Sequence, residues 1–161
     1  MIIKQLAVPK SSNQSFQMRR DYFPKHQSIW HYHEEVELVL VKKGAGTLFI
    51  GDRIKNFQPG GLVLIPPQVP HYWLFDESEG TDESDEPIDC FVIHFKNDFG
   101  VEKFLNIPEM NNIKSLLIQS TRGKYIELTE NNYIVKLIIG CLESTGITKL
   151  FNLLEALNLI N

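Results

Sequence analysis

Short hydrophobic runs separated by turn residues dominate the first 96 residues of the chain. Between positions 36 and 65, the runs VELVLV, TLFI, RIKNF and LVLI are separated by KKGAG, GD and QPGG, and HYWLF and IDCFVIHF follow. Short β-rich runs broken by glycine, proline and aspartate are typical of antiparallel sheets. The pattern predicts about seven or eight strands in a jelly roll or small barrel, after a polar arm over residues 1–28 with one or two short strands.

The spacing of apolar residues changes to the helix period after residue 96. In PEMNNIKSLLIQSTRG, proline stands at a favourable first helical position and glycine stands just past the end. NNYIVKLIIGCLES and TKLFNLLEALNLIN also place apolar residues three or four apart, with Gly146 expected to end the first and Thr148 to cap the second. Three helices are therefore expected. Their apolar stripes are typical of core or dimer packing.

Composition adds that the chain is an ordinary globular domain. Its 161 residues, 43% of them hydrophobic, are enough for one domain with a substantial core. No stretch approaches the roughly 18 apolar residues of a membrane span, and the first residues show no signal peptide pattern. Both cysteines lie in apolar surroundings, as expected of buried reduced thiols. We therefore expect a cytoplasmic protein with no membrane contact.

The net charge of −4 arises from one acidic segment. DESEGTDESDE, residues 76–86, contains seven acidic residues, so the rest of the chain carries a small positive charge. This segment lacks the ligand spacing of an EF-hand and is expected to be a solvated loop. Lysine and arginine are scattered without forming a basic stripe. These residues alone are therefore not expected to bind nucleic acid.

Ionisable residues gather in WHYHEEVE, at the entrance to the first regular strand. His31, His33 and Glu37 share odd parity, but a regular strand would separate His33 from Glu37 by roughly 13 Å. Because a first-row metal holds its ligands at about 2.0–2.2 Å, the three can share an ion only if the chain bends at EEV. His71, after the IPPQVP break, would complete a set of three imidazoles and one carboxylate. Such a set suits Zn, Fe, Mn, Ni or Cu.

The surroundings of Glu37 favour a pocket over a solvated rim. VELVLV is apolar on both faces, so a charged group within it must be paired, liganded or near water. Trp73 and Phe75 share parity with His71 and would offer ring faces to a sugar or another ring-shaped ligand. The candidate ligand-binding residues are His31, His33, Glu37, His71, Trp73 and Phe75. For the first four, a bound metal, a polar pocket lining and a plain structural role remain open, whereas His94 is expected to be a core histidine.

These motifs resemble those of a known family. The spacing H-x-H-x3-E-x6-G over residues 31–44, followed by P-x4-H over residues 66–71, is similar to the two motifs of the cupin superfamily. Together with FVIHFKNDFG and TRGKYI, the segments containing them resemble the N-terminal sensor domain of AraC-type transcription regulators over about residues 27–126. Two positions depart from the second cupin motif, which usually has glycine in place of Gln68 and asparagine in place of Phe75.

The resemblance implies a cupin double-stranded β-helix, a jelly-roll barrel, into which His31, His33, Glu37 and His71 point. It implies an N-terminal arm and barrel over residues 1–96, and a helical connector and dimerisation segment over residues 97–161. In this family the arm can fold over a pocket for a small-molecule effector, commonly a sugar. No helix-turn-helix domain is recognisable within the chain, so the DNA-binding domain is expected downstream of Asn161.

The expected function is therefore non-enzymatic: an effector-sensing, dimerising domain whose candidate cofactor is a first-row divalent metal such as Zn, Ni, Fe or Mn. A metal-dependent cupin enzyme, such as a dioxygenase or isomerase, is the main alternative, and a stand-alone binding cupin is the third. The expected dimer seam lies on one face of the last helix and comprises Leu150, Leu153, Leu154 and Leu157. The alternative is that this helix is used up in the core of the monomer.

Overall fold

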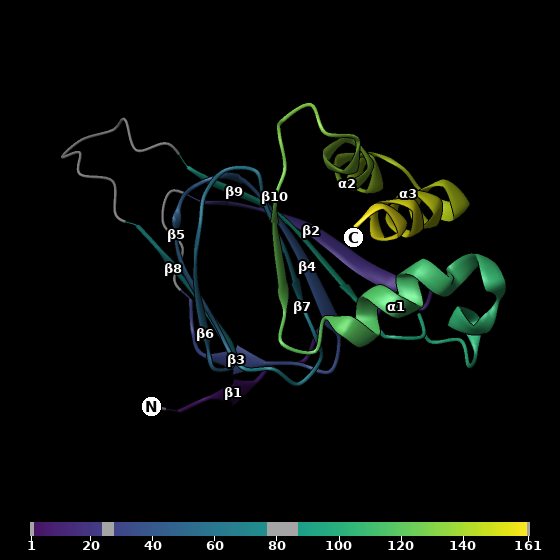
Figure 1. Ribbon diagram of the computed structural model, residues 1–161, viewed down its shortest axis with the longest axis horizontal. Helices are drawn as coiled ribbons and strands as arrows, with labels where there is room; N and C mark the ends of the chain where they lie inside the picture. The colour runs from purple at the N-terminus through teal and green to yellow at the C-terminus, as the bar shows by residue number, and fades with distance from the viewer. Residues whose placement is uncertain (1, 24–27, 77–86, 161) are drawn as a thin grey trace.

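Two five-stranded sheets face each other in the computed structural model, which describes residues 2–23, 28–76 and 87–160 (Figure 1). The first sheet has the order β1-β3-β8-β5-β6, with β1 (Lys4–Gln5), β3 (His31–Tyr32), β8 (His71–Phe75), β5 (Gly46–Ile50) and β6 (Arg53–Phe57). The second has the order β10-β7-β4-β9-β2, with β10 (Lys124–Glu127), β7 (Gly61–Ile65), β4 (Val36–Lys43), β9 (Ile88–Phe95) and β2 (Phe16–Phe23). The mainly β, jelly-roll fold is confirmed, as an open sandwich rather than a closed barrel. Most of the predicted acidic loop lies outside the described residues.

The second sheet lies at the centre of the molecule and is buried on both faces. Along β4, Leu38 and Leu40 belong to the core cluster beneath the helices, whereas Val39 and Val41 belong to the cluster between the sheets. This alternation follows from the two-residue period of a strand. It explains why VELVLV is apolar on both faces and why Glu37, between Val36 and Leu38, points toward the space between the sheets.

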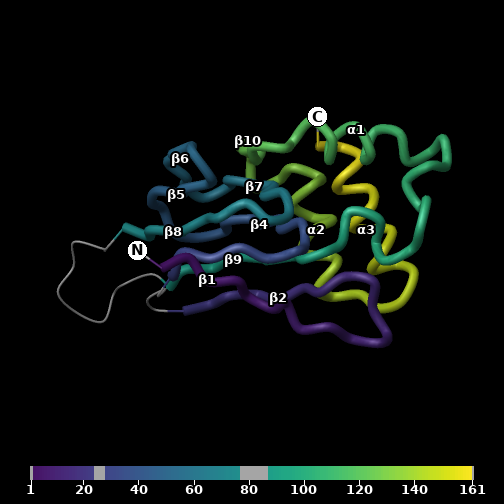
Figure 2. Tube along the Cα trace, turned by 90° about the horizontal axis from the view of Figure 1, so that it is seen from below, coloured from purple at the N-terminus to yellow at the C-terminus, as the bar shows by residue number. Residues whose placement is uncertain are grey.

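The helices cover the outer face of the second sheet (Figures 1 and 2). Two short 3-10 helices precede three α-helices: η1 (Phe104–Asn106), η2 (Pro108–Met110), α1 (Asn111–Gln119), α2 (Tyr133–Glu143) and α3 (Gly146–Leu159). The Asn132 side chain caps α2 by accepting a hydrogen bond from the Ile134 N–H. The three predicted helices are confirmed. The expected cap at Thr148 is wrong, because Thr145 occupies that position and Gly146 begins α3.

The leucines of α3 are unequally exposed. Leu153 and Leu157 are fully buried in the core of this chain, Leu154 is 8% exposed, and Leu150 is half-buried. Most of this set is therefore used within the monomer, which is the alternative that the sequence left open. No helix among the described residues is both long and apolar enough to cross a membrane.

Two strands of the second sheet depart from the sequence pattern. The arm contains β2, which is eight residues long and pairs with β9 along its whole length. After α1, the chain returns to the sheet as β10, antiparallel to β7, within the segment expected to be helical. These two strands form the edges of the sheet that carries Glu37.

Candidate metal and effector site

The bend that a shared site requires is present between β3 and β4. β3 ends at residue 32 in the first sheet, and β4 begins at residue 36 in the second. The chain turns between them, so that His33 Nε2 lies 3.2 Å from Glu37 Oε2. His33 and Glu37, which a straight strand would hold far apart, therefore meet in the gap between the two sheets.

β8 brings the third histidine to the same place. His71 pairs with His31 across β3 and β8, and their ring centroids lie 4.2 Å apart. The ligand atoms of His31, His33, Glu37 and His71 all lie within 4.8 Å of one another. His71 is fully buried, and its Nε2 has no hydrogen-bond partner among the residues that the structure describes; it lies 3.8 Å from Glu37 Oε1. The structure thus places together the four residues that the spacing singled out.

Backbone carbonyls fix the tautomer of each of the three histidines. In His31, His33 and His71, Nδ1 lies 2.8, 2.9 and 2.9 Å from a carbonyl oxygen two residues away along the chain. Because a carbonyl only accepts, each Nδ1 carries a proton and, in the neutral ring, each Nε2 is left with its lone pair. The neutral cluster therefore presents three lone pairs and a carboxylate to one another, a set of acceptors without a donor.

Protonation of one histidine relieves part of this conflict in the absence of a metal. Burial opposes ionisation of Glu37, but hydrogen bonds from His33 and His94 outweigh it and hold the pKa of Glu37 well below its ordinary value. Burial likewise opposes a charge on His33, yet its bond to Glu37 leaves the pKa of His33 raised. Burial lowers the pKa of His71, which favours its neutral form. Glu37 is therefore an anion. The neutral ring of His71, next to that of His33, keeps a free lone pair on Nε2.

A divalent cation fits this donor set. Ligands around a first-row metal at about 2.1 Å lie within about 4.2 Å of one another, so the 4.8 Å cluster needs only a small contraction. Neutral imidazole nitrogens with one carboxylate oxygen suit Zn, Fe, Mn or Ni. A cation would also give the orphaned Nε2 of His71 the partner that it lacks.

His94 also belongs to the cluster, although the sequence analysis expected it to be a core histidine only. Its Nε2 lies 2.6 Å from Glu37 Oε2, because the two residues are direct partners in the β4–β9 register. Arg19 Nη1 approaches the other ring nitrogen at 3.5 Å, and a guanidinium can only donate. Nδ1 of His94 is therefore the acceptor and Nε2 carries the proton. His94 donates to Glu37, whereas the three other histidines offer lone pairs, so His94 holds a ligand in place instead of being one.

Aromatic rings lie beside the cluster. Trp73 is 7% exposed, and its ring lies 5.0 Å from that of Phe57 in an edge contact and 6.2 Å from that of the half-buried Phe75. With Arg19 and Asp21, which are joined by a 2.8 Å ion pair, Trp73 and Phe75 help to line a hollow of about 60 Å³. This is well below the roughly 300 Å³ of a typical small-molecule site, so a ligand there must move side chains outward.

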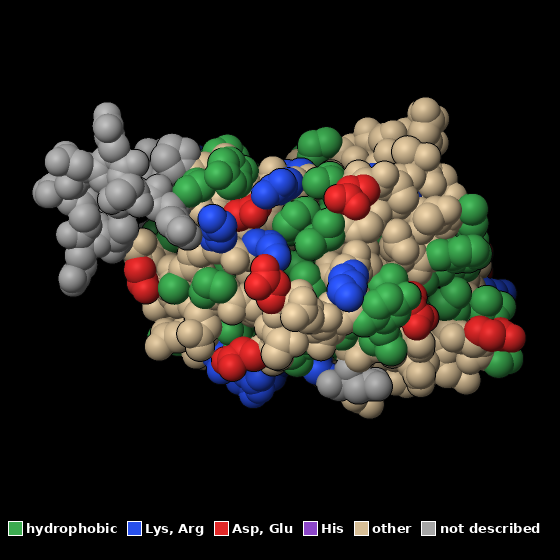
Figure 3. All heavy atoms as spheres, turned by 90° about the horizontal axis from the view of Figure 1, so that it is seen from above, with side chains coloured by type: hydrophobic (Ala, Val, Ile, Leu, Met, Phe, Trp, Pro, Cys, Tyr) green, Lys and Arg blue, Asp and Glu red, His purple; other side chains and the backbone are tan. Residues whose placement is uncertain are grey.

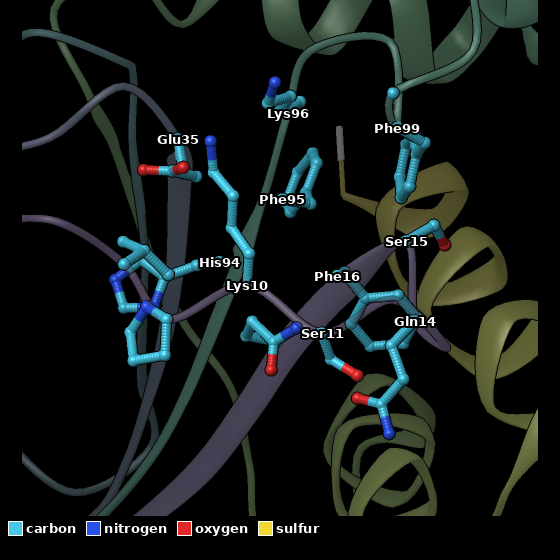
Figure 4. A pocket seen from close by; sticks show the side chains of 14 residues that line it. Lys10, Ser11, Gln14, Ser15, Phe16, Glu35, His94, Phe95, Lys96 and Phe99 are labelled. Carbon is cyan, nitrogen blue, oxygen red and sulfur yellow. The ribbon is translucent and has the colours of Figure 1, made fainter.

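A larger pocket lies under the N-terminal arm and shares His94 with the cluster (Figure 4). Its volume is about 200 Å³. Lys10 on the arm and Lys96 at the end of β9 supply cations, Glu35 supplies a carboxylate, and Phe99 contributes an aromatic wall. The pocket therefore combines charged and apolar walls and adjoins the cluster through one ring.

Gln68 lies in the turn between β7 and β8, where the second motif comes close to the first. Its φ angle is +64°, in the left-handed region that favours glycine, and its N–H donates to the His33 carbonyl at 2.8 Å. The backbone here has the conformation that the usual motif glycine would adopt, in spite of the departure in sequence.

Comparison with known proteins identifies a family by sequence. The family described as the AraC-like ligand binding domain matches residues 13–98, which is more than half of the chain. This span includes β2 to β9 and every residue of the His/Glu cluster. A search of curated proteins returns no match.

Solved structures of ToxT share this fold at low sequence identity. ToxT from Vibrio cholerae has a TM-score of 0.58 and 13% identity, with 89% of this chain and 54% of that one covered. ToxT from V. cholerae O395, solved with a methylnaphthalenyl butenoic acid, gives a TM-score of 0.57 and 14% identity over 89% and 54%. A cupin 2 conserved barrel domain protein from Rhodopseudomonas palustris covers 55% of this chain and 57% of its own at 18% identity, with a TM-score of 0.40. This chain thus spans about half the length of the ToxT chains that it matches.

Proposed function

Because the chain belongs to the AraC-like ligand binding domain family, we propose that it is the effector-sensing domain of an AraC-type transcription regulator. The observation that carries this proposal is a cluster of ionisable side chains between two sheets, beside one hollow near Trp73 and another under the arm. Buried ionisable groups next to open space are typical of ligand sites. Sensing, rather than core stability, is the role that this arrangement supports best.

A first-row divalent metal held by His31, His33, Glu37 and His71 is part of the proposal. When bound, such an ion would supply a Lewis acid to which oxygen atoms of an effector can bind. The backbone carbonyls at the three Nδ1 atoms and the donor of His94 hold the ligands in position.

Elemental analysis tests the metal site. The purified protein is expected to carry about one Zn, Ni, Fe or Mn per chain, and His71→Ala should remove most of it because a four-ligand site loses one donor. His94→Gln keeps an N–H beside Glu37 and is the matched control, expected to retain most of the metal. A metal-free protein whose thermal stability is unchanged by EDTA and by added metal would contradict the site.

The proposed effector is a small polar molecule with an apolar face, such as a sugar or an organic acid. It would bind against His31, His33, Glu37, His71, Trp73 and Phe75, or under the arm. The organic acid solved with ToxT is a ligand of that protein and offers a compound class to include. A thermal-shift screen of sugars, sugar acids and aromatic acids should find a compound that, at about 100 times its Kd, stabilises the fold by roughly 2.7 kcal/mol.

Two variants separate the two pockets. Trp73→Ala should abolish the shift if the effector lies between the sheets, and Lys96→Ala should abolish it if the effector lies under the arm. A shift that survives both substitutions would contradict both placements. The absence of any shift across the screen, with metal supplied, would contradict sensing itself.

DNA contact is assigned to a domain outside these 161 residues, expected downstream of Asn161. On the face seen in Figure 3, lysine and arginine side chains are interspersed with acidic ones instead of forming a stripe. Phosphate contacts need clustered cations, so this chain alone should show no micromolar, salt-sensitive binding to duplex DNA. The proposed regulator would act in the cytoplasm as a homodimer.

A metal-dependent cupin enzyme is the second candidate, and the three-histidine, one-carboxylate set is the observation that favours it. A catalytic role predicts turnover of a small molecule by the metal-loaded chain, lost in His71→Ala. Binding of the effector without turnover, by contrast, supports the sensor.

A further inference from the structure

An open groove separates the edge strands β6 and β10. Among the described residues, each lies at the end of its sheet and pairs with one neighbouring strand, β6 with β5 and β10 with β7. Figures 1 and 2 place both edges on the same side of the sandwich, away from the edge formed by β2. Between them lies a cavity of about 300 Å³, which is separate from the His/Glu cluster.

The walls of this groove carry an excess of positive charge. Arg53 and Lys55 come from β6, and Arg122 and Lys124 come from the segment that enters β10. They are all at least partly exposed, and Arg122 forms a 2.5 Å ion pair with Asp52. In the part of the chain that the structure describes, these four cations have one acidic partner, so the groove is net positive on a chain whose net charge is −4.

The floor of the groove is apolar. Leu48 and Ile50 are buried, and the half-buried ring of Tyr125 closes the other side. Lys55 Nζ lies 4.6 Å from the centre of the Tyr125 ring and connects the two walls. An occupant would therefore meet apolar surface below, cations on both walls and unpaired strand edges alongside.

We propose that this groove binds an acidic polypeptide segment in an extended conformation, which adds as a strand to the edge of β6 or β10. Free strand edges bind extended peptides through main-chain hydrogen bonds, and side chains on alternate positions supply specificity. Charges on an edge strand can also serve only to prevent pairing. Two edges that face each other across a cavity with an apolar floor favour binding, because protection of an edge requires no cavity.

Fluorescence anisotropy with a synthetic probe tests this proposal. The probe is a labelled peptide of about eight residues that alternates threonine with glutamate, a length typical of a strand. Binding to the full chain is expected, weakening as salt rises because exposed charges are screened. The Arg53→Glu/Lys55→Glu variant should weaken it roughly tenfold or more, whereas Lys103→Glu/Lys136→Glu, with the same charge change on exposed residues elsewhere, should not.

Two further probes decide how the peptide is held. The same peptide methylated at its backbone nitrogens keeps its charges but loses the donors of a strand, and it should bind markedly more weakly. Equal binding of the methylated peptide would overturn strand addition. Tighter binding of a single-stranded oligonucleotide at the same residues, or no binding of the acidic peptide by a correctly folded chain, would overturn the choice of partner.

Discussion

Hydrogen bonds from His33 and His94 stabilise the charge on Glu37. Glu37 is 4% exposed, and the 2.6 Å contact with His94 is the shortest of its three imidazole contacts. In metal-free protein, His94→Leu should therefore lower the free energy of unfolding by about 2–4 kcal/mol, because a buried carboxylate loses a donor. His94→Gln, which keeps an N–H, should lose less than half of that. Urea denaturation in EDTA measures both, and equal losses would show that packing, not the donor, is what His94 contributes.

The two cysteines should be chemically silent in the folded chain. Burial raises the pKa of Cys90 to about 12 and that of Cys141 to about 11. At pH 8 the thiolate fraction is then about one in a thousand or less, and thiolate is the reactive form. We expect no reaction with a thiol reagent within minutes in buffer and two equivalents per chain in denaturant. Rapid labelling of one thiol in the native protein would contradict this burial.

At the residue scale, parity and composition could predict most of the His/Glu cluster but not its fifth member. His31, His33, Glu37 and His71 follow from motif spacing together with a required bend, and the structure contains that bend. His94 could not be identified, because its role depends on the register between β4 and β9. A single sequence gives the face of a strand but not its partner residue.

At the scale of elements, the turn at Gly60 joins β6 to β7 and contacts Leu128, which follows β10. Its φ angle is +90°, and a Cβ there would lie 2.3 Å from the Leu128 carbonyl oxygen. Its N–H donates to the Val41 carbonyl, and its own carbonyl accepts from the Leu128 N–H. A side chain at Gly60 would therefore clash with the residue at which β10 leaves the sheet. Gly60→Ala should destabilise the protein by at least about 2–3 kcal/mol, from backbone strain plus displacement of this segment.

Gly100 provides the matched control for this substitution. Its φ angle of +76° also disfavours a side chain, but a Cβ there would meet nothing within 4 Å. Gly100→Ala should cost only about 1 kcal/mol, the conformational cost alone. Thermal unfolding separates the two variants, and similar melting temperatures would mean that the contact of Gly60 with Leu128 does not restrain β10.

The elements that the sequence predicted incompletely (β2, expected only as a short strand of the arm) or not at all (β10) are those whose stability comes from a distant neighbour. β2 has exposed and buried positions in no regular alternation, and its pairing with β9 makes it a strand. β10 is four residues long, and its pairing with β7 likewise decides its state. By contrast, the central strands and the three helices were predictable. Continuous apolar runs indicate strands buried on two faces, and amphipathic spacing indicates helices, and both patterns can be recognised in the local sequence.

At the scale of the whole molecule, the burial of Leu153, Leu154 and Leu157 moves the expected dimer contact to Leu150 and its exposed neighbours on α3. Ile147 and Phe151 are 61% and 59% exposed, and Leu150 between them is half-buried. These positions are spaced i, i+3 and i+4, so they form one stripe on α3. Leu142 of α2, which is 41% exposed, extends the apolar surface of the helical layer. Exposed apolar side chains on a helical layer are typical of an interface, and a two-fold contact would pair two sensor domains.

Phe151→Glu tests this placement of the dimer. The substitution puts a charge into the stripe on α3 while leaving the buried Leu153 and Leu157 in place, so it should give a folded monomer. Light scattering at micromolar concentration should report twice 18.6 kDa for the unmodified chain and 18.6 kDa for the variant. Ile54→Glu alters a residue on β6 that is 69% exposed and should leave the dimer intact, whereas Leu157→Glu should unfold the chain because its site is in the core. A dimer that survives Phe151→Glu would place the contact on the sheets, and an unmodified chain that remains monomeric at high concentration would show that these residues do not dimerise by themselves.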